Sequence, residues 1–476
     1  MFARCRKVFL GVSIAAACVA STPLMAQGGS SGYSRPPAQI LEVMRAPSPP
    51  AAHVSPTEDR ILLVSMQDYP SIARVATPFL RLAGVRIEPR NHRKHDTPAG
   101  YGITPCARTF EVVQVSDGAQ VHVALPAGAC PQLPTWTADG RMFAFENISV
   151  DAVELWIGDA KTGHIHRIPG ARLNPMLEDS VQWMPDQKRL LVKLVPQGMG
   201  PPPAEPVVPS GPSIQESGGE KGQSSTYENR DTLNNRHDED LFDYYAASQL
   251  ALVDSATGAI TPLGKPGLYE SLELAPDGRH VLVTTIHKPY SYVTTHDRFP
   301  RDVDAWDVSN PSSIAVHRIA SLPLADRVPI RGVPLGPRAF AWRATAPATL
   351  VWAEALDRGD WNVNAPARDK VMLWKAPFSG APAEIARTEQ RYAGCLWSDQ
   401  PGLALLTEYD LNRRWRRTFL VDVDDPQAKP RVLWDLSIDE RYANPGTPVW
   451  RQLANGAWVL RREGDSIFLQ IGRAHV

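Results

Sequence analysis

One short phrase recurs along this chain, and it constrains the fold more than any other feature. An apolar residue leads into a tight turn rich in Asp, Gly and Pro, and an alternating apolar strand follows. The phrase reads TWTADGRMFAF from Thr135 and ELAPDGRHVLVTT from Glu273. The last starts are roughly 55 residues apart, about the length of a four-stranded antiparallel sheet with its turns. The seven starts are Val54, Trp136, Trp183, Leu274, Trp342, Trp397 and Trp450.

A second hairpin follows most of these starts. Its turn contains Asp, Gly or Thr, because Gly adopts positive φ without steric cost and Asp caps the turn with its own side chain. Two hairpins make a four-stranded sheet, and a ring of such sheets can bury both faces of each one. The alternative is a set of unrelated hairpins in sandwiches. The second hairpins are segments 110–125, 154–168, 250–263, 371–386 and 418–435.

The repeats therefore predict an all-β fold, a β-propeller of antiparallel four-stranded blades. Six repeats are full and the seventh begins but is incomplete at the C-terminus, and the propeller spans residues 51–470. The leading Trp or Leu of each repeat should lie in the face that packs between neighbouring blades.

Residues 1–26 have the order of an export signal. A basic start containing Arg4 and Arg6 precedes the apolar run VFLGVSIAAACVA, and LMAQ offers a cleavage point after Ala26. We expect an exported, periplasmic protein. A buried core helix is one alternative, and lipid anchoring through Cys18 is another that the loose AAAC box favours less. Residues 27–50 form a lead-in arm with a short helix at PAQILEVMRA, and no later stretch is apolar for long enough to span a bilayer.

Charge and cysteine content limit the partners. The formal net charge is −1, whereas a nucleic-acid or anionic-membrane partner needs a clustered basic excess, so we expect no nucleic-acid partner. The cysteines lack zinc-finger and Cys-x-x-Cys spacing, and nothing predicts a metal or a cofactor. An oxidising compartment would allow Cys106 and Cys130, which lie in one early segment, to form a disulfide.

Two insertions interrupt the repeats. Residues 196–239 are rich in Pro, Gly and Ser, with a centre expected to be mobile, and HDEDLFD (237–243) overlaps their end. We interpret HDEDLFD as a docking loop and not a calcium site, because it lacks the Gly-centred spacing of calcium loops. The second insertion, between residues 66 and 109, contains NHRKHD (91–96). It has no third well-spaced ligand, so we predict a solvated loop there and not a metal site.

Several longer phrases, in one order, carry a resemblance to a known family. The chain from about Gly32 to Leu469 resembles the N-terminal, propeller part of glutamyl endopeptidases of the prolyl oligopeptidase family, in particular its bacterial members. The phrases are GYSRPPAQILEVMRAPSPPAAHVSPTEDRILLV, LRLAGVRI, PVVPSGP, DLFDYYAASQLALV, HKPYSYVTTHDRFPRDVDAWD, AFAWRATAPATLVWAEALDRGD and RRWRRTFLV.

The resemblance implies that the propeller gates peptide access to an α/β-hydrolase domain with a Ser-Asp-His triad, which cleaves peptides after Glu. We expect the hydrolase domain of the family to be absent from this chain, and we expect no G-x-S-x-G nucleophile elbow anywhere in it. No catalytic residue therefore transfers, and we expect this chain alone to be inactive. The expected partners are peptide substrates and the missing hydrolase domain. The alternative function is a stand-alone periplasmic propeller that binds peptides or a partner protein.

Two further segments carry expectations. NRRWRRT contains Arg413, Arg414, Arg416 and Arg417, which would gather acidic peptides if they faced the central chamber. Strand alternation lets only one set of them point inward, so all four cannot contribute. We favour the alternative of a solvated hairpin on the outer edge, where Arg also discourages strand-to-strand aggregation. The last residues, IGRAHV (471–476), can be encoded by a common sequencing-adapter sequence, so we expect them not to be biological. The alternative is an ordinary strand end before a true stop codon.

Overall fold

The computed structural model describes residues 36–97, 102–207, 230–425 and 427–472. Two compact units are present, Met1–Pro47 and Ser48–Val476. Within the described part of the first unit, helix α1 (Ala38–Arg45) forms where the sequence predicted a short helix. The expected export signal (1–26), the centre of the Pro/Gly/Ser-rich insertion and the end of the IGRAHV segment lie outside the described residues.

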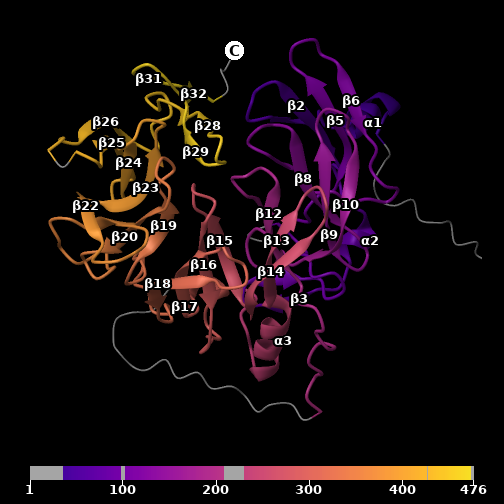
Figure 1. Ribbon diagram of the computed structural model, residues 1–476, viewed down its shortest axis with the longest axis horizontal. Helices are drawn as coiled ribbons and strands as arrows, with labels where there is room; N and C mark the ends of the chain where they lie inside the picture. The colour runs from indigo at the N-terminus through magenta and orange to yellow at the C-terminus, as the bar shows by residue number, and fades with distance from the viewer. Residues whose placement is uncertain (1–35, 98–101, 208–229, 426, 473–476) are drawn as a thin grey trace, which may run out of the picture. The chain divides into compact units, whose positions relative to one another are not determined.

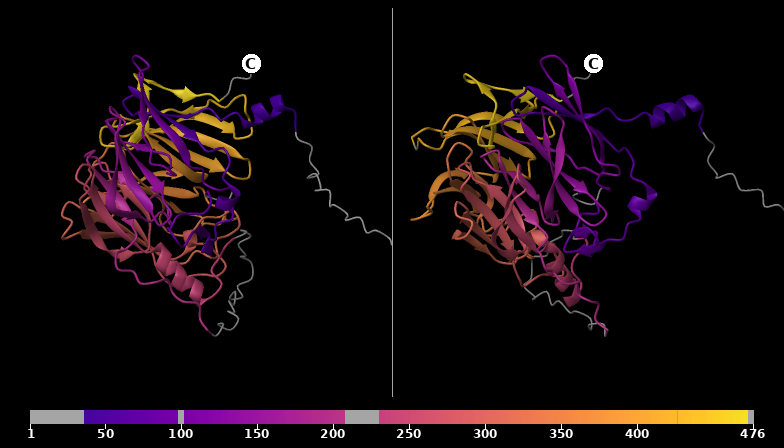
Figure 2. Two further views of the ribbon diagram at one scale, coloured as in Figure 1. Left: turned by 90° about the vertical axis from the view of Figure 1, so that its right-hand side faces the viewer. Right: turned by 45° about the vertical axis from the view of Figure 1, so that its right-hand side comes forward.

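The second unit is a β-propeller built from antiparallel four-stranded blades, as predicted. In Figures 1 and 2 the colour passes gradually from one sheet to the next, because each blade uses consecutive strands. Blade 1 is β1 (Ala51–Val54), β2 (Arg60–Met66), β5 (Ala107–Gln114) and β6 (Gln120–Val123). Blade 2 is β7 (Thr135–Trp136), β8 (Met142–Ile148), β9 (Val153–Asp159) and β10 (Ile165–Leu173). Blade 3 is β11 (Val181–Trp183), β12 (Arg189–Leu194), β13 (Ser248–Asp254) and β14 (Ile260–Gly267).

The next three blades repeat this order of strands. Blade 4 is β15 (Tyr269–Leu274), β16 (His280–Ile286), β17 (Arg301–Asp307) and β18 (Ala315–Leu322). Blade 5 is β19 (Arg338–Trp342), β20 (Thr349–Ala355), β21 (Asp369–Lys375) and β22 (Ala383–Thr388). Blade 6 is β23 (Arg391–Trp397), β24 (Leu403–Asp410), β25 (Trp415–Asp422) and β26 (Arg431–Ser437).

The seventh repeat contributes a hairpin to the described structure. Strands β28 (Trp450–Gln452) and β29 (Trp458–Leu460) pair with each other, and Leu460 forms a parallel bridge to Ser398, which directly follows β23, the first strand of blade 6. Short two-stranded sheets flank this hairpin. They pair β27 (Thr447–Pro448) with β32 (Leu469–Gln470), and β30 (Arg462–Glu463) with β31 (Ser466–Ile467).

The recurring phrase folds into the same turn in the first four blades. The N–H of the first turn residue donates to the carbonyl five residues later, as from Ala275 to His280 at 2.9 Å. The fourth turn residue has positive φ, which favours Gly, and Gly140 and Gly278 have φ of 66° and 64°. Glu58 and Gln187 occupy the same position in their blades with φ of 59° and 57°. The turn is therefore set by backbone hydrogen bonds and the Asp cap, and Gly is preferred there but not required.

A separate apolar core lies between each pair of neighbouring blades. Leu155 and Ile157 of blade 2, for example, pack against Leu190 and Val192 of blade 3, and all four are buried. Five leading residues pack in the core that their blade shares with the preceding blade, as the sequence predicted, whereas Trp450 of the seventh repeat is exposed, so the prediction was wrong there, and Val54 of blade 1 is exposed as well. The five that pack in this way are Trp136, Trp183, Leu274, Trp342 and Trp397.

Blades 2 and 3 are not separate four-stranded sheets, because the outer strand of blade 2 is hydrogen-bonded to the second strand of blade 3. The outer strand β10 pairs with β9, but its register shifts between Arg167 and Arg172. Beyond this irregularity, Leu173 pairs with Leu194 of β12, so that the two blades form one eight-stranded sheet. Pro169 and Gly170 lie within the shifted segment, and Gly170 has φ of 78°. A Pro and a left-handed Gly interrupt regular pairing and redirect the strand.

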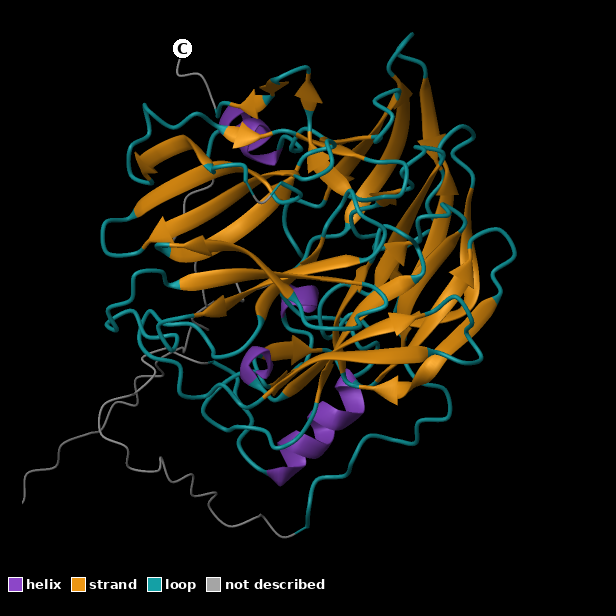
Figure 3. Ribbon diagram, turned by 60° about the vertical axis from the view of Figure 1, so that its left-hand side comes forward, coloured by secondary structure: helices purple, strands orange, loops and turns teal. Residues whose placement is uncertain are grey.

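The two insertions pack together, and both local expectations for them were wrong. HDEDLFD is not a loop: it lies in helix α3 (Arg236–Ala246), which begins after Asn235, whose side chain accepts a hydrogen bond from the Asp238 N–H. Helix α3 is the long helix at the bottom of Figures 1 and 3. Its apolar face packs against the connection between β16 and β17 of blade 4, where the rings of Phe242 and Phe299 lie 5.8 Å apart. Capping and an amphipathic face explain the helix.

NHRKHD is not a solvated loop, because most of its side chains are buried. It follows α2 (Ile72–Val75), β3 (Leu80–Leu82) and β4 (Val85–Ile87) of the other insertion. Asn91 donates to the Ser149 carbonyl of blade 2 at 3.1 Å, and the His92 ring packs against Tyr245 of α3 at 5.1 Å. Burial and Arg172 lower the pKa of His92 to about 4. The segment is polar in sequence but covered on both sides by other parts of the fold.

Candidate functional site

The innermost strands of four blades line a cavity of about 840 Å³, called here the inner cavity. Its wall is formed by His53 of β1, Trp136 of β7, Trp183 of β11 and Glu273 of β15, with Trp458 of the seventh hairpin. In each of these four blades the leading residue of the repeat ends the first strand, and all four strand ends line the inner cavity. The same packing that builds the core therefore builds this cavity.

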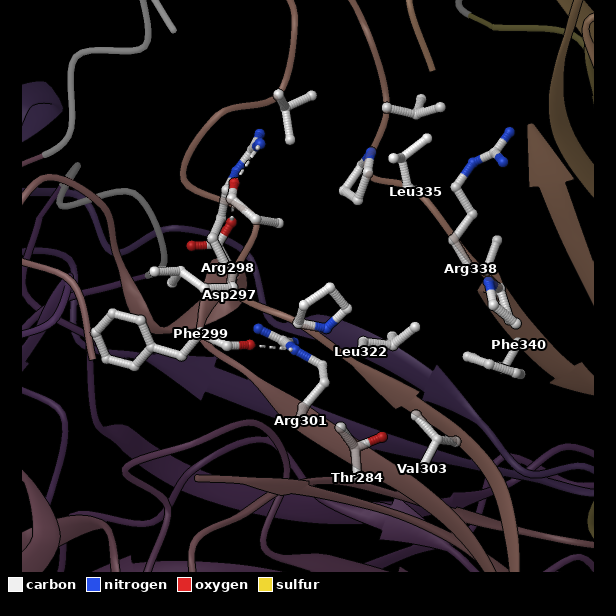
Figure 4. Close-up of a pocket in the computed structure, with 18 of the residues that line it drawn as sticks. Thr284, Asp297, Arg298, Phe299, Arg301, Val303, Leu322, Leu335, Arg338 and Phe340 are labelled. Atoms are coloured by element: carbon white, nitrogen blue, oxygen red, sulfur yellow. Dashed lines mark hydrogen bonds and ion pairs between the residues drawn. The ribbon is translucent and has the colours of Figure 1, made fainter. Parts of the chain in front are cut away.

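A second cavity, of about 660 Å³, lies between blades 4 and 5 and is called here the interblade cavity. The sheet of blade 4, strand β19 and the connecting segment 323–337 line it. Apolar side chains such as Val303, Leu322 and Phe340 form part of its surface (Figure 4). It contains more cations than anions, with five Arg against two Glu and one Asp: Arg298, Arg301, Arg327, Arg338 and Arg358 against Glu270, Glu273 and Asp297.

Glu273 lines both cavities. Its position on β15 follows from the phrase that starts blade 4, where it comes directly before Leu274. Burial alone raises the pKa of its carboxyl group to about 7. The carboxyl group is therefore able to change its charge near neutral pH, at the point where the two cavities meet.

Two Arg side chains of the interblade cavity are held in place by buried or partly buried acids. Arg301 pairs with Glu270 and donates to the Phe299 carbonyl at 3.1 Å and the His296 carbonyl at 2.7 Å. Figure 4 shows the Arg301 side chain extending toward Phe299, and Arg338 on the opposite side of the cavity beside Phe340. Such fixed guanidinium groups present their remaining N–H groups in a defined direction.

Arg338 is fixed by a network behind the cavity. Its Nη2 donates to the carboxylate of Asp369 at 2.6 Å, and that carboxylate also accepts from Arg391 at 2.8 Å and from the Tyr392 N–H at 2.7 Å. Asp369 is fully buried. The Nη1 of Arg338 is buried and has no hydrogen-bond partner among the described residues. Arg338 is therefore a preorganised donor with one N–H group not yet used.

These cavities have the chemistry of binding sites and not of an acyl-transfer site. Among the described lining residues, the interblade cavity contains Ser271 and Asp297 but no His. The inner cavity contains His53 and Asp179 but no Ser among its described lining residues. Neither set supplies the Ser, His and carboxylate that nucleophilic catalysis needs in one place. In the interblade cavity, an excess of Arg over apolar walls instead suits a ligand with acidic groups.

The Arg cluster singled out in the sequence lies elsewhere, at and beside the start of β25, the third strand of blade 6. Arg414 pairs with Asp439 at 2.7 Å, and Arg417 bonds Glu408 at 2.7 Å. Arg413 is exposed and its guanidinium lies 4.7 Å from the Trp415 ring. Arg416 is exposed as well. The four do not line either of the two cavities, so their proposed role in gathering peptides stays a prediction.

Two further expectations from the sequence concern the cysteines and the G-x-S-x-G pattern. A disulfide joins Cys106 to Cys130 and ties the start of β5 to the segment before β7. The expectation that the pattern G-x-S-x-G is absent was wrong. The string GGSSG occurs at Gly28–Gly32, in a Gly/Ser-rich segment that lies outside the described residues.

No motif or spacing in the sequence singles out Glu273, Arg301 or Arg338 as a site residue. Glu273 and Arg338 belong to inner strands, where strand alternation turns every second side chain to one face. That alternation alone cannot tell which face borders a cavity. Arg301 begins β17, whose neighbour across the cavity is far away in the sequence.

Two plant proteins are similar to this chain over almost all of its length. The chain is 35% identical to a protein of Oryza sativa subsp. japonica over 447 residues, which cover 90% of this chain and 46% of the relative. It is 33% identical to a protein of Arabidopsis thaliana over 459 residues, 91% of this chain and 46% of the relative. Both carry the name "Probable glutamyl endopeptidase, chloroplastic". The chain spans about half the length of these curated relatives.

Solved structures of low identity are also similar. Acylaminoacyl peptidase of Pyrococcus horikoshii is 11% identical with a TM-score of 0.41, over 83% of this chain and 47% of that one. The β-propeller domain of the Trilobed protease from Pyrococcus furiosus is 9% identical with a TM-score of 0.34, over 84% of this chain and 99% of that one. No family model matches the chain. Among the described residues, no helix has the length and apolar character to cross a membrane.

Proposed function

We propose that this chain is the propeller part of an exported serine peptidase of the prolyl oligopeptidase family, resembling glutamyl endopeptidases. In this role the propeller limits which peptides reach a hydrolase domain that cleaves peptide bonds, with a preference for the bond after Glu. The chain by itself carries no catalytic residue in this proposal. The hydrolase domain is its proposed partner, and peptides are the proposed substrates.

One observation carries the proposal. The similarity to the two plant proteins extends over nine tenths of this chain without being confined to the short repeated phrase. Unrelated propellers share blade turns, since those turns follow from backbone geometry. They do not share 33% or more of their residues over 447 or more aligned positions. The similarity therefore supports a common ancestor with peptidases and not a common fold alone.

The residues that line the two cavities give a physical reason why the propeller would select among peptides. A peptide that passes along the inner strands meets Glu273, which adjoins the Arg-rich interblade cavity. The excess of Arg there favours acidic side chains of a peptide over basic ones. Arg301 and Arg338 are the residues to which we assign this preference. Export to the periplasm is also part of the proposal, supported by the order of charge, apolar run and small residues in 1–26.

The experiment that tests the proposal is sequencing of the source locus across codon 470, followed by an assay of the open frame that it gives. We expect a frame that continues to a G-x-S-x-G, then an Asp and a His. The full product should hydrolyse peptides containing Glu, and a serine-directed reagent should stop it. The 476-residue chain, assayed as the matched control, should show no turnover, because neither cavity brings a Ser, a His and a carboxylate together among its described lining residues.

Two results would contradict the proposal. A stop codon directly after Gln470 in the native locus would leave a binding propeller, which is the alternative function. Serine-reagent-sensitive turnover by the 476-residue chain alone would show that catalytic residues lie within it. In the full product, Arg338→Gln should raise KM for acidic peptides with little change in kcat, since Arg338 is assigned to binding.

A further inference from the structure

A third cavity lies on the outer side of blade 2, away from the two cavities described above. It encloses about 1130 Å³ between that blade and the insertion that contains β3 and β4. Arg74 and Arg93 of the insertion line one side, and Ile148 and Trp156 of blade 2 line the other. The disulfide-bonded Cys130 belongs to a third wall, formed by residues 126–130. We call this cavity the outer cleft.

Two guanidinium groups in the outer cleft share one carboxylate oxygen. The Glu88 Oε1 lies 2.6 Å from Arg74 Nη1 and 4.0 Å from Arg93 Nε. It also lies 2.9 Å from His95 Nδ1. Glu88 and Arg93 are both buried, with 7% and 5% of their side chains exposed. Glu146, which does not line the cleft, also attracts Arg93. Among the lining residues, one carboxylate serves two buried or partly buried cations, so the lining carries an excess of positive charge.

Both Arg residues also have unused N–H groups. The Nε of Arg74 and the Nη2 of Arg93 are buried without a hydrogen-bond partner among the described residues. Burial and the charge of Arg74 lower the pKa of Arg93 to about 10, so it stays protonated at neutral pH. A buried donor without an acceptor costs free energy, and two of them beside one another are better explained by an acceptor that is supplied from outside.

The remaining charges of the outer cleft are already paired. Arg90 donates to Asp151 at 2.9 Å, and Arg167 donates to Glu154 at 3.0 Å. The other walls are largely apolar, with Pro78, Pro89 and Pro126 beside Ile148 and Trp156. The unpaired positive charge in the cleft is therefore confined to Arg74 and Arg93. The apolar walls around these two residues favour a ligand whose body is apolar.

We propose that the outer cleft binds the carboxylate of a ligand whose body is apolar, and that Arg74 and Arg93 hold this carboxylate. A single negative charge balances the excess that Glu88 leaves, which favours a carboxylate over a phosphate dianion. A guanidinium group matches the two oxygens of a carboxylate in geometry as well as in charge. The carboxylate belongs either to a small organic acid or to the C-terminus of a peptide. The site is separate from the proposed peptidase function and does not depend on it.

The test is isothermal titration calorimetry on the full chain at neutral pH. The small-acid probe is N-benzoylglycine, and the peptide probe is an acetylated tripeptide that ends in leucine with a free carboxyl group. We expect saturable binding of one or both probes, and the probe that binds identifies the source of the carboxylate. The amide form of each binding probe should bind at least about tenfold more weakly, because it lacks the charge that Arg74 and Arg93 recognise.

Variants assign the binding to the outer cleft. Arg74→Gln should weaken it at least about tenfold, since a hydrogen bond to a charged group is lost. This variant is preferred to Arg93→Gln because the Arg74 side chain is 18% exposed and its loss disturbs the core less. Arg90→Gln is the matched control: Arg90 lines the same cleft but is 70% exposed and paired with Asp151. It should change the affinity by less than about twofold.

Several outcomes would overturn the proposal. Neither acid binding to the wild-type chain would mean that water alone satisfies the two Arg residues. Equal affinity for an acid and its amide would remove the role of charge. Inorganic phosphate binding more tightly than both acids would exclude a carboxylate as the ligand. Undiminished binding in a folded Arg74→Gln variant, with circular dichroism unchanged, would place the ligand elsewhere.

Discussion

At the residue scale, the leading tryptophans join neighbouring blades by a hydrogen bond as well as by packing. The indole N–H of Trp136 donates to the His53 carbonyl at 3.2 Å, and that of Trp342 donates to the Glu273 carbonyl at 2.9 Å. The acceptor in each case directly precedes the leading residue of the blade before. Trp183 does the same with Thr135, at 3.1 Å. A single residue type thus repeats one contact from blade to blade.

Trp397 breaks this pattern. Its Nε1 is buried and has no partner among the described residues. The equivalent acceptor would be the carbonyl of Ala341, and the register of β19 shifts between Arg338 and Ala341. An irregular strand changes the direction of its carbonyl groups. Comparing variants of Trp342 and Trp397 therefore separates the contribution of the indole hydrogen bond to stability from the contribution of packing.

We predict that Trp342→Phe lowers the free energy of unfolding by about 1 kcal/mol more than Trp397→Phe does. Both side chains are similarly buried, with 8% and 5% exposed, so the packing loss is comparable. Only Trp342→Phe removes a hydrogen bond and leaves the Glu273 carbonyl without it. Urea denaturation of both variants measures the difference, and an equal loss in the two would show that the indole hydrogen bond contributes nothing.

At the element scale, the turn that opens each blade also contacts the blade before it. Gly278 has φ of 64°, and a Cβ atom there would lie 3.2 Å from Pro185 Cγ in the turn of blade 3. Gly118, in the second hairpin of blade 1, has φ of 71° and open space around such an atom. The two glycines therefore share a backbone conformation but differ in their surroundings.

We predict that Gly118→Ala destabilises the protein by about 1 kcal/mol, the cost of a left-handed conformation for a residue with a side chain. Gly278→Ala should cost about 2 kcal/mol, because the contact with Pro185 adds to the same backbone cost. The measurement is the midpoint of thermal unfolding for each variant. Equal midpoints would mean that the turns of blades 3 and 4 separate at no cost.

The element scale also shows which segments could be predicted from the sequence. The strands of the blades follow from alternation and from turn residues, and both signals are local. The insertions could not be placed in this way. NHRKHD is polar, and only the chain segments that cover it, from blade 2 and α3, make Asn91 and His92 buried. A helix signal precedes HDEDLFD, the N-cap residue Asn235, and the expectation of a loop did not use it.

At the scale of the whole molecule, the seventh hairpin is held more strongly by blade 6 than by blade 1. Val459 is fully buried in the core that it shares with Trp397 and Leu406 of blade 6. Toward blade 1, Arg461 pairs with Glu58 at 2.6 Å, but 41% and 55% of these side chains are exposed. Exposed ion pairs contribute about 0–1 kcal/mol, whereas a buried apolar side chain contributes more.

We predict that Val459→Ala lowers the local stability of the β28–β29 hairpin by about 2 kcal/mol. Glu58→Gln should lower it by less than about 1 kcal/mol, because its ion pair is screened by water. Native-state hydrogen exchange of the hairpin amides measures both effects separately from global unfolding. Faster exchange in Glu58→Gln than in Val459→Ala would show that the contact with blade 1 holds the hairpin.

The sequence by itself determined the blades, their number of strands and the place of the leading residues. These features depend on residues that lie close together in the chain, and the same phrase is repeated often enough to be recognised. Only the tertiary structure decided where cavities form and what lines them. Glu273 borders two cavities, and the outer cleft lies between blade 2 and the insertion that contains β3 and β4, because blades and insertions distant in sequence pack together. Contacts of that kind leave no periodic signal, since each is made once and between segments that no local rule relates.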